Sequence, residues 1–149
     1  MSAVAATSPV IAARPALGAA VALLEGAGLP AKDLTAAHLE YFFYSGAPES
    51  PSGLVGLELS DDTALLRSLV VTPEARTRGL GSMLVEHAEG YARSRGAGAL
   101  YLLTTTAERF FAKRGYTRIA RGAVAEAVRN SHEFKDLCPD TSALMLKPL

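Results

Sequence analysis

Hydrophobic residues in the first half of the chain recur at every second position, which is the period of a β-strand. In the clearest case Val55, Leu57 and Leu59 fall on one face, and Glu58 falls on the other. Proline, glycine and serine gather at 45–52 and predict a loop there. Strands are expected over residues 9–13, 41–44, 53–59 and 63–72. Their short connections predict an antiparallel meander.

The second half of the chain changes to helical spacing. Leu84, Ala88 and Ala92 recur every four residues and predict a helix over 82–94. The apolar strand expected at 99–103 has helices on both sides, as in a parallel crossover. Further helices are expected at 15–25, near 33–39, at 107–114 and at 124–130, and a last strand at 142–146. This order of elements predicts a mixed α+β fold.

Composition limits the class of protein. The chain has 149 residues, of which 49% are apolar, enough for one domain with its own core. Lys and Arg number 15 and Asp and Glu also number 15, a balance that argues against nucleic acid as a partner. No apolar run approaches the roughly 20 residues of a membrane span, so no membrane partner is expected. Residues 1–8 are expected to be disordered, and the oligomeric state stays open, a homodimer included.

The chain contains one cysteine, Cys138. A single cysteine permits no disulfide within the chain, which indicates a reducing, cytoplasmic compartment. It is also a poor site for trivalent arsenic, and with Pro139 beside it we expect a packing residue. No metal site is predicted.

A glycine-bearing turn joins the strand at 63–72 to the helix that follows. A helix start presents free N–H groups and the positive end of the helix dipole, and both attract phosphate. Glycines let an anion approach the backbone closely, and arginines add positive charge. The turn consists of Arg76, Thr77, Arg78, Gly79, Leu80 and Gly81. It therefore predicts a site for a pyrophosphate.

Three classes of glycine loop bind phosphate in this way. A P-loop needs Gly-Lys-Ser/Thr, which is absent, and a dinucleotide fingerprint needs a third glycine where Leu84 stands. Residues 71–81 read Val-Thr-Pro-Glu-Ala-Arg-Thr-Arg-Gly-Leu-Gly. They resemble the acetyl-CoA signature of the GNAT superfamily of N-acetyltransferases, Val-x-Pro-x-x-Arg-x-x-Gly-x-Gly. Gly115-Tyr116 extends the resemblance, because the superfamily usually has Gly-Phe or Gly-Tyr there.

Two narrower resemblances concern the acceptor. Residues 65–69, 101–108 and 133–139 look like acetyltransferases associated with bacterial arsenic-resistance clusters. The run from Leu102 to Tyr116 is also similar to the acetyltransferase domain of N-acetylglutamate synthases. Both resemblances imply that the acceptor is the primary amine of a small molecule, such as an amino acid, and neither fixes which one.

The superfamily resemblance implies a fold and a cofactor site. A central, mostly antiparallel sheet of six to seven strands is flanked by helices and splays open where acetyl-CoA binds. The pantetheine arm bonds to the backbone of residues 69–71, and the pyrophosphate rests on residues 78–82. The implied cofactor-binding residues are Leu69, Val70, Val71, Arg76, Thr77, Arg78, Gly79, Leu80, Gly81, Ser82, Thr104, Ala107, Phe110 and Phe111.

Acetyl transfer needs a neutral amine, a donor for the thioester oxyanion and a proton for the departing thiolate. The backbone N–H near Val70 is the expected oxyanion donor. Glu58 is the first candidate base, although a solvent-facing strand residue is the more common reading of such a glutamate. Glu108 is a further carboxylate, which can equally be a partner of its helix dipole. Ordered water can replace either. The superfamily usually has a tyrosine where Phe111 stands. The proton would then come from Tyr116, from a threonine of 104–106 or from water, unless the thiolate leaves unaided.

Arg67 interrupts an otherwise apolar strand and is expected to share a face with Leu65, Leu69 and Val71. Because an unpaired buried charge is costly, Arg67 needs a partner. It either binds a substrate carboxylate, with Thr105 as a second substrate contact, or pairs with Glu58 or another acid.

These features predict an acetyl-CoA-dependent N-acetyltransferase that acts on a small amine by direct attack in a ternary complex. Two alternatives stay open. One is a non-catalytic acyl-CoA-binding or regulatory protein, and the other is an acetyltransferase for a protein N-terminus or lysine.

Overall fold

The computed structural model describes residues 10–120 and 142–149. The helix expected at 124–130, the disorder expected over 1–8 and the packing role expected for Cys138 lie outside the described residues.

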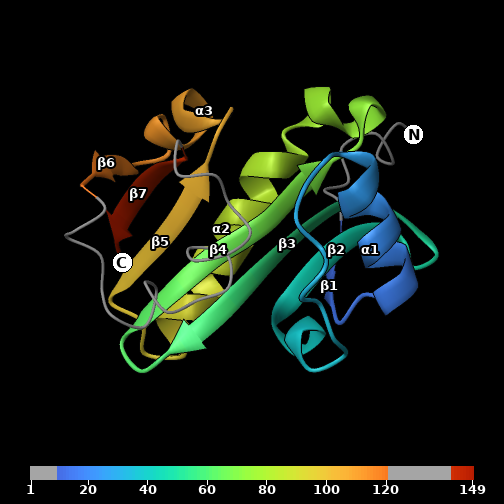
Figure 1. Ribbon diagram of the computed structural model, residues 1–149, viewed down its shortest axis with the longest axis horizontal. Coiled ribbons are helices and arrows are strands. Elements are labelled where there is room, and N and C mark those ends of the chain that lie inside the picture. Colours follow the sequence, from blue (N-terminus) through green and yellow to red (C-terminus); the bar gives the residue numbers. More distant parts are fainter. Residues whose placement is uncertain (1–9, 121–141) are drawn as a thin grey trace, which may run out of the picture.

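Seven strands form one sheet in the order β1-β2-β3-β4-β5-β7-β6 (Figure 1). The pairing of β4 with β5 is parallel, and every other pairing in this part of the chain is antiparallel. The strands are β1 (Ile11–Ala13), β2 (Phe42–Ala47), β3 (Ser50–Ser60), β4 (Thr63–Val71), β5 (Ala99–Thr104), β6 (Thr117–Ile119) and β7 (Ala143–Pro148). The predicted α+β class, the meander and the parallel crossover are confirmed.

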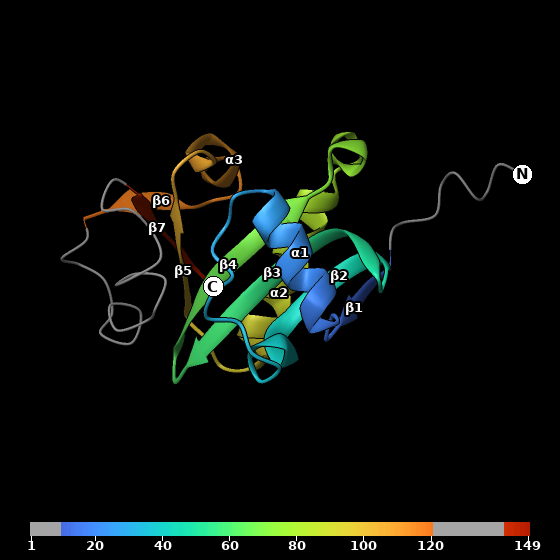
Figure 2. The same cartoon turned by 45° about the vertical axis from the view of Figure 1, so that its right-hand side comes forward.

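Helices cover both faces of the sheet (Figures 1 and 2). On one face Leu24 packs with Leu54 and Val70, and on the other Leu84 packs with Val55 and Leu57. Leu54 and Val55 are neighbours in β3 and point to opposite faces, as the strand period requires. None of the described helices is long and apolar enough to cross a membrane. The helices are α1 (Leu17–Gly26), α2 (Leu80–Ser94) and α3 (Glu108–Ala112), with 3-10 turns η2 (His38–Tyr41) and η3 (Pro73–Arg78).

The prediction of a loop at 45–52 is wrong. Strands β2 and β3 continue to a two-residue turn, and Pro51 pairs with Gly46 inside the ladder. The register shifts between Ser45 and Gly46, and Gly46 has a φ of +95°. A bulge of this kind accommodates both a proline and a glycine within a strand. The helix expected near 33–39 is also wrong, because only the 3-10 turn η2 forms there.

We expect Gly56→Ala to destabilise the fold by about 1–3 kcal/mol, because an added Cβ overpacks the core. That Cβ would overlap the ring of Phe42, which is fully buried. Gly90→Ala is the matched control, since Gly90 lies inside α2 with nothing within 4 Å of the added Cβ. It should stabilise the helix by about 0.5–1 kcal/mol. Urea unfolding measures both, and equal stability of the two variants would contradict this packing.

Candidate active site

Strands β4 and β5 separate after a short stretch of parallel pairing. They pair only where residues Thr63 to Leu65 face Ala99 to Tyr101, and beyond that they diverge toward their carboxyl ends (Figure 1). The backbone groups of the later part of β4 that face β5 therefore have no strand partner in the described part of the chain. The splayed sheet implied by the resemblance is confirmed.

A β-bulge in β4 lies at the start of this opening. Gly56 faces Arg67 and Leu54 faces Val70, so Val55 of β3 opposes two residues of β4, Ser68 and Leu69. Ser68 has a φ of +62°, a left-handed conformation that is uncommon outside glycine. A bulge bends the strand that carries it. The bend lies in the part of β4 that is no longer paired with β5.

The bulge also changes which side chains of β4 share a face. This corrects the prediction that Arg67 lies on the same face as Leu69 and Val71. Leu69 and Val71 pack with the α2 cluster, whereas Arg67 bonds to a residue of the segment after α1. Arg67 therefore does not share a face with Leu69 and Val71. The extra residue at the bulge shifts the two-residue alternation by one position.

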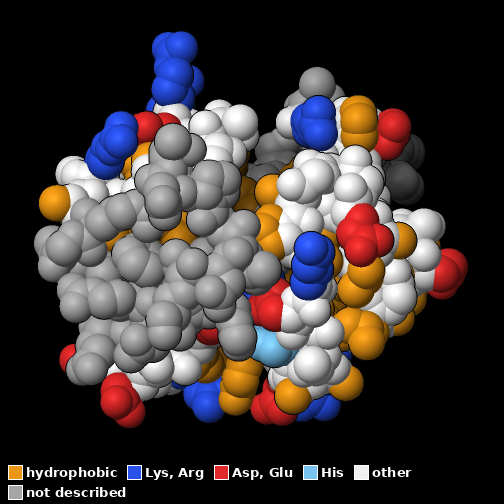
Figure 3. Space-filling model, viewed as in Figure 1, with side chains coloured by type: hydrophobic (Ala, Val, Ile, Leu, Met, Phe, Trp, Pro, Cys, Tyr) orange, Lys and Arg blue, Asp and Glu red, His pale blue; other side chains and the backbone are white. Residues whose placement is uncertain are grey.

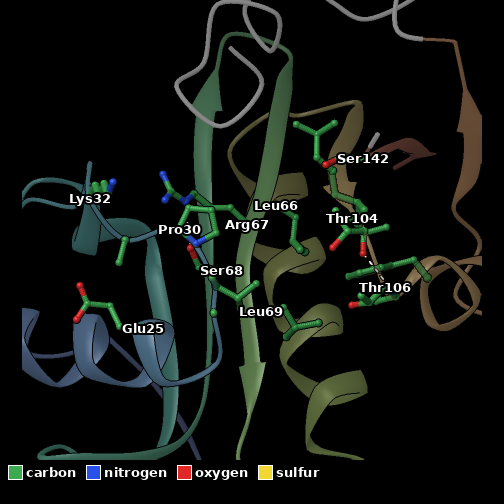
Figure 4. Close-up of a pocket in the computed structure, with 18 residues that line it drawn as sticks. Glu25, Pro30, Lys32, Leu66, Arg67, Ser68, Leu69, Thr104, Thr106 and Ser142 are labelled. Atoms are coloured by element: carbon green, nitrogen blue, oxygen red, sulfur yellow. Dashed lines mark hydrogen bonds between the residues drawn. The ribbon is translucent and has the colours of Figure 1, made fainter. Parts of the chain in front are cut away.

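A cavity of about 530 Å³ lies in the gap between the strands (Figure 4). Residues 66–69 of β4 form one side, and residues 102–107 with Phe111 form the other. The end of α1 and the segment after it close a third side, where Glu25 and Lys32 lie. Thr104, Thr105 and Thr106 line the cavity, and Thr104 Oγ1 accepts a hydrogen bond of 2.9 Å from the N–H of Ala107. Among the implied cofactor contacts, the structure brings Leu69, Thr104, Ala107 and Phe111 together here.

The glycine turn lies at the carboxyl end of β4. Gly79 adopts the left-handed conformation, with φ of 73° and ψ of 16°, and ends η3 where α2 begins. The N–H of Met83 bonds to the carbonyl of Gly79, so the N–H groups of residues 80–82 precede the first helical hydrogen bond. These groups can donate to an anion.

Side chains around this turn hold it in place. Arg76 Nε donates to the carbonyl oxygen of Val71 at 3.0 Å, which ties η3 to the end of β4. Leu80 is buried in the core, and the Phe110 ring packs against Gly81. The hydroxyl of Ser82 accepts hydrogen bonds from Arg114, a residue that the sequence analysis did not assign to the site.

Arg67 is 2% exposed and lies in a network of acids. Its Nη1 donates to Asp33 Oδ2 at 2.5 Å and to Glu58 Oε2 at 2.8 Å, and its Nη2 donates to Asp33 Oδ1 at 2.8 Å. The structure thus forms the pairing with Glu58 and another acid that the sequence analysis left open. Burial opposes ionisation of Asp33, but the hydrogen bonds and charge of Arg67 outweigh it and lower the Asp33 pKa.

The same network bears on metal binding. Ligand atoms of Asp33, His38 and Glu58 lie within 4.8 Å of one another. However, Arg67 Nη1 bonds to both carboxylates. The guanidinium already supplies the positive charge that a cation would bring, so these residues do not make a convincing metal site.

The two residues predicted to move protons lie away from the cavity lining. Glu58 is partly exposed and accepts a hydrogen bond from Arg67. Tyr116 is buried, and its hydroxyl donates to Glu89 Oε2 at 2.8 Å. Burial first, and then the hydrogen bond and charge of Glu89, raise the pKa of Tyr116. A hydroxyl held in this way is a poor proton donor for a thiolate in the cavity, and both assignments stay predictions.

A sheet that opens beside a helix start with free N–H groups suits an elongated ligand that carries phosphates, and acyl-coenzyme A is such a ligand. A family model described as "Acetyltransferase (GNAT) family" matches residues 22–116. The chain belongs to this acetyltransferase family, whose cofactor is acetyl-CoA. No match was found among curated proteins.

Solved structures share the fold. N-acetylglutamate synthase from Neisseria gonorrhoeae, complexed with coenzyme A and N-acetyl-glutamate, superposes with a TM-score of 0.79 at 21% identity over 96% of this chain. The chain covers 35% of that synthase. Rv2747 from Mycobacterium tuberculosis, in complex with CoA and NLQ, gives a TM-score of 0.75 at 23% identity, with 95% of this chain and 99% of that one covered. PaiA N-acetyltransferase from Thermoplasma acidophilum, in complex with coenzyme A, gives a TM-score of 0.66 at 14% identity. The match covers 96% of this chain and 100% of that one.

We expect Asp33→Asn to lower the free energy of unfolding by about 1.5–3 kcal/mol at neutral pH, since Arg67 loses a charged acceptor. The Asp33 pKa lies below its ordinary 3.8 in the folded state. Its contribution is therefore complete well above pH 3.8 and is lost as the pH falls through the folded-state value.

Urea unfolding of wild type and Asp33→Asn across the acid range measures this difference. Asp62→Asn, the same change at an exposed turn residue, is the control and should have little effect. A stability gap that stays constant as the pH falls would contradict the pairing of Asp33 with Arg67.

Proposed function

We propose that the chain transfers the acetyl group of acetyl-CoA to the primary amine of a small molecule, an amino acid or a related compound, in a ternary complex. The observation that carries this proposal is the cavity between the diverging strands β4 and β5. Residues 66–69 of β4 line it, and the same strand leads through η3 to the start of α2, where free N–H groups are proposed to bind the phosphates. One elongated cosubstrate with a thioester at one end and phosphates at the other fits both features.

In this proposal the pantetheine arm lies along β4 and bonds to the backbone of Leu69, Val70 and Val71. The pyrophosphate accepts hydrogen bonds from the N–H groups of residues 79–82, with Arg76, Thr77 and Arg78 beside it. The N–H near Val70 points to the thioester oxygen and stabilises the oxyanion that forms on attack. These contacts are made by backbone, so they need an open strand and a bent turn rather than particular side chains.

The size and lining of the cavity support a small acceptor. About 530 Å³ is within the usual range for small-molecule sites. Glu25 and Lys32 offer both signs of charge to a compound that carries an amine and a carboxylate. Thr105 is a substrate contact of the proposal, and Arg67, which lines the cavity while it is paired with Asp33 and Glu58, is proposed as the second. The bound N-acetyl-glutamate of the Neisseria synthase structure supports an amino-acid acceptor, although that likeness covers only part of the synthase.

In this proposal no tyrosine supplies the proton for the departing thiolate. Phe111 stands where a tyrosine acid is usual, and the Tyr116 hydroxyl is engaged with Glu89. The thiolate therefore leaves unaided, or takes a proton from water or from a threonine of 104–106. Thiols are much more acidic than alcohols, with a pKa of about 8.5 for cysteine, so a thiolate can leave without prior protonation. Glu58 stays a candidate base, acting through ordered water.

Surface charge, compartment and family resemblance bear on which partner the enzyme has. On the face shown in Figure 3, basic side chains are scattered among acidic ones, which suits a small-molecule enzyme better than a nucleic-acid-binding protein. The reaction would take place in the cytoplasm, where acetyl-CoA is available. The resemblance to arsenic-resistance acetyltransferases suggests an arsenic-related acceptor as a narrower candidate, to be included among the amines tested.

The proposed reaction is tested by release of the coenzyme thiol from acetyl-CoA in the presence of amino acids, aminoglycosides, polyamines and lysine peptides. We expect turnover with at least one small amine and none with the peptides. Tight acetyl-CoA binding without turnover on any amine would favour a non-catalytic acyl-CoA-binding protein. Turnover on peptides alone would favour a protein acetyltransferase.

We expect Gly81→Glu to weaken acetyl-CoA binding at least about a hundredfold, or about 2.7 kcal/mol. The new carboxylate would stand where the pyrophosphate is proposed to bind and would repel it. Gly90→Glu places the same side chain in the same helix, away from the turn and without neighbours within 4 Å. Calorimetric titration should show normal binding for this control. Retained binding by a folded Gly81→Glu variant would refute the proposed location of the cofactor.

A further inference from the structure

Arg114 lies two residues beyond α3 and reaches across to the first turn of α2. Its Nε donates to Ser82 Oγ at 3.0 Å, and its Nη2 donates to the same hydroxyl. Its Nη1 donates to the carbonyl oxygen of Phe110 at 2.6 Å. The guanidinium carbon lies 3.6 Å from the centre of the Phe110 ring, which completes a stacked arrangement. The guanidinium is therefore held in one position.

The charge of Arg114 is not neutralised by these contacts. Both acceptors, a hydroxyl and a carbonyl, are neutral, and within the described ranges no carboxylate is paired with Arg114. Arg67, by contrast, is paired with two carboxylates. Arg114 also lies beside the positive end of the α2 dipole, which repels a cation. Two positive groups fixed next to each other favour an anion that contacts both.

The position of Arg114 joins it to the glycine turn. A Cβ added to Gly81 would lie 3.4 Å from Phe110 Cζ, so the ring that carries the guanidinium packs directly against the turn. Ser82, which Arg114 contacts, belongs to the residues proposed to hold the pyrophosphate. Arg114, Phe110 and the start of α2 thus form one continuous surface, contributed by two elements far apart in the sequence.

We propose that Arg114 is a phosphate-binding residue for the cosubstrate, in addition to the glycine turn. This inference rests on the proposed use of acetyl-CoA and extends it to a residue outside the signature at 71–81. The ligand chemistry is a phosphate ester anion. Coenzyme A carries two such groups, the pyrophosphate and the 3′-phosphate, and Arg114 could bind either of them.

A structural role predicts different behaviour. If Arg114 only ties α3 to α2, its loss would lower the melting temperature. Any loss of coenzyme A affinity in the variant would then be the same at low and at high salt. A charge contact with phosphate weakens as salt is raised, because counterions screen it. Arg114→Lys separates the two roles, since it keeps the charge and loses the planar fork that bonds to Ser82 and Phe110.

The experiment is calorimetric titration of wild type, Arg114→Gln and Arg114→Lys with coenzyme A at about 50 mM and about 500 mM salt. We expect Arg114→Gln to weaken binding about tenfold or more at low salt, with a smaller effect at high salt. Arg114→Lys should recover much of the affinity. Lys113→Gln removes a neighbouring exposed cation and should bind as wild type does.

Titration with 3′-dephospho-coenzyme A identifies the phosphate. If the loss in Arg114→Gln persists with this ligand, Arg114 binds the pyrophosphate, and if the loss disappears, it binds the 3′-phosphate. Either result supports the inference. Wild-type affinity in Arg114→Gln, or equal and salt-independent losses in both Arg114 variants, would overturn it. Failure of the wild type itself to bind coenzyme A would instead overturn the proposed function.

Discussion

The early end of the pairing between β4 and β5 is the constraint on which the rest of the structure depends. Parallel strands normally bond along their common length, but here the pairing ends at Leu65, and a bulge at Ser68 bends β4 shortly beyond that point. Backbone N–H and C=O groups that line an open cavity can bond to water or to a ligand. In the proposed function the pantetheine arm, an extended chain with amides along its length, bonds to them. Helix α2 packs in one core cluster with strands on both sides of the gap, which holds the two halves of the sheet together.

Two arginines near this opening differ in how the structure compensates their charge. Arg67 is buried on β4 and bonds to Asp33 and Glu58, so it fastens the segment after α1 to the sheet. This segment forms a wall of the cavity. Arg114 is fixed equally well, but by neutral acceptors. Arg67 is paired with two carboxylates of the chain, whereas Arg114 has neutral acceptors in the described residues and is proposed to bind a phosphate.

The features that the sequence predicted well are those set by neighbouring residues. The glycine turn, the helix after it and the alternation in β3 follow from local spacing, and the family resemblance added the splayed sheet. The bulge at Ser68 has no such signal, because serine is not a residue that pattern analysis places at positive φ. Missing it put Arg67 on the wrong face. Asp33 is separated from Arg67 by 34 positions, so their pairing depends on the folded chain. Tyr116 matched a sequence motif, but only the structure shows that Glu89 holds its hydroxyl.

The central claim is that the opening between β4 and β5 is the acetyl-CoA site. A crystal structure of the chain with coenzyme A bound tests it most directly. The account predicts the pantetheine arm between the two strands, with its amides bonded to the backbone of residues 69–71, and the pyrophosphate against the N–H groups at the start of α2. Coenzyme A bound elsewhere, or strands β4 and β5 paired along their full length beside it, would contradict the account.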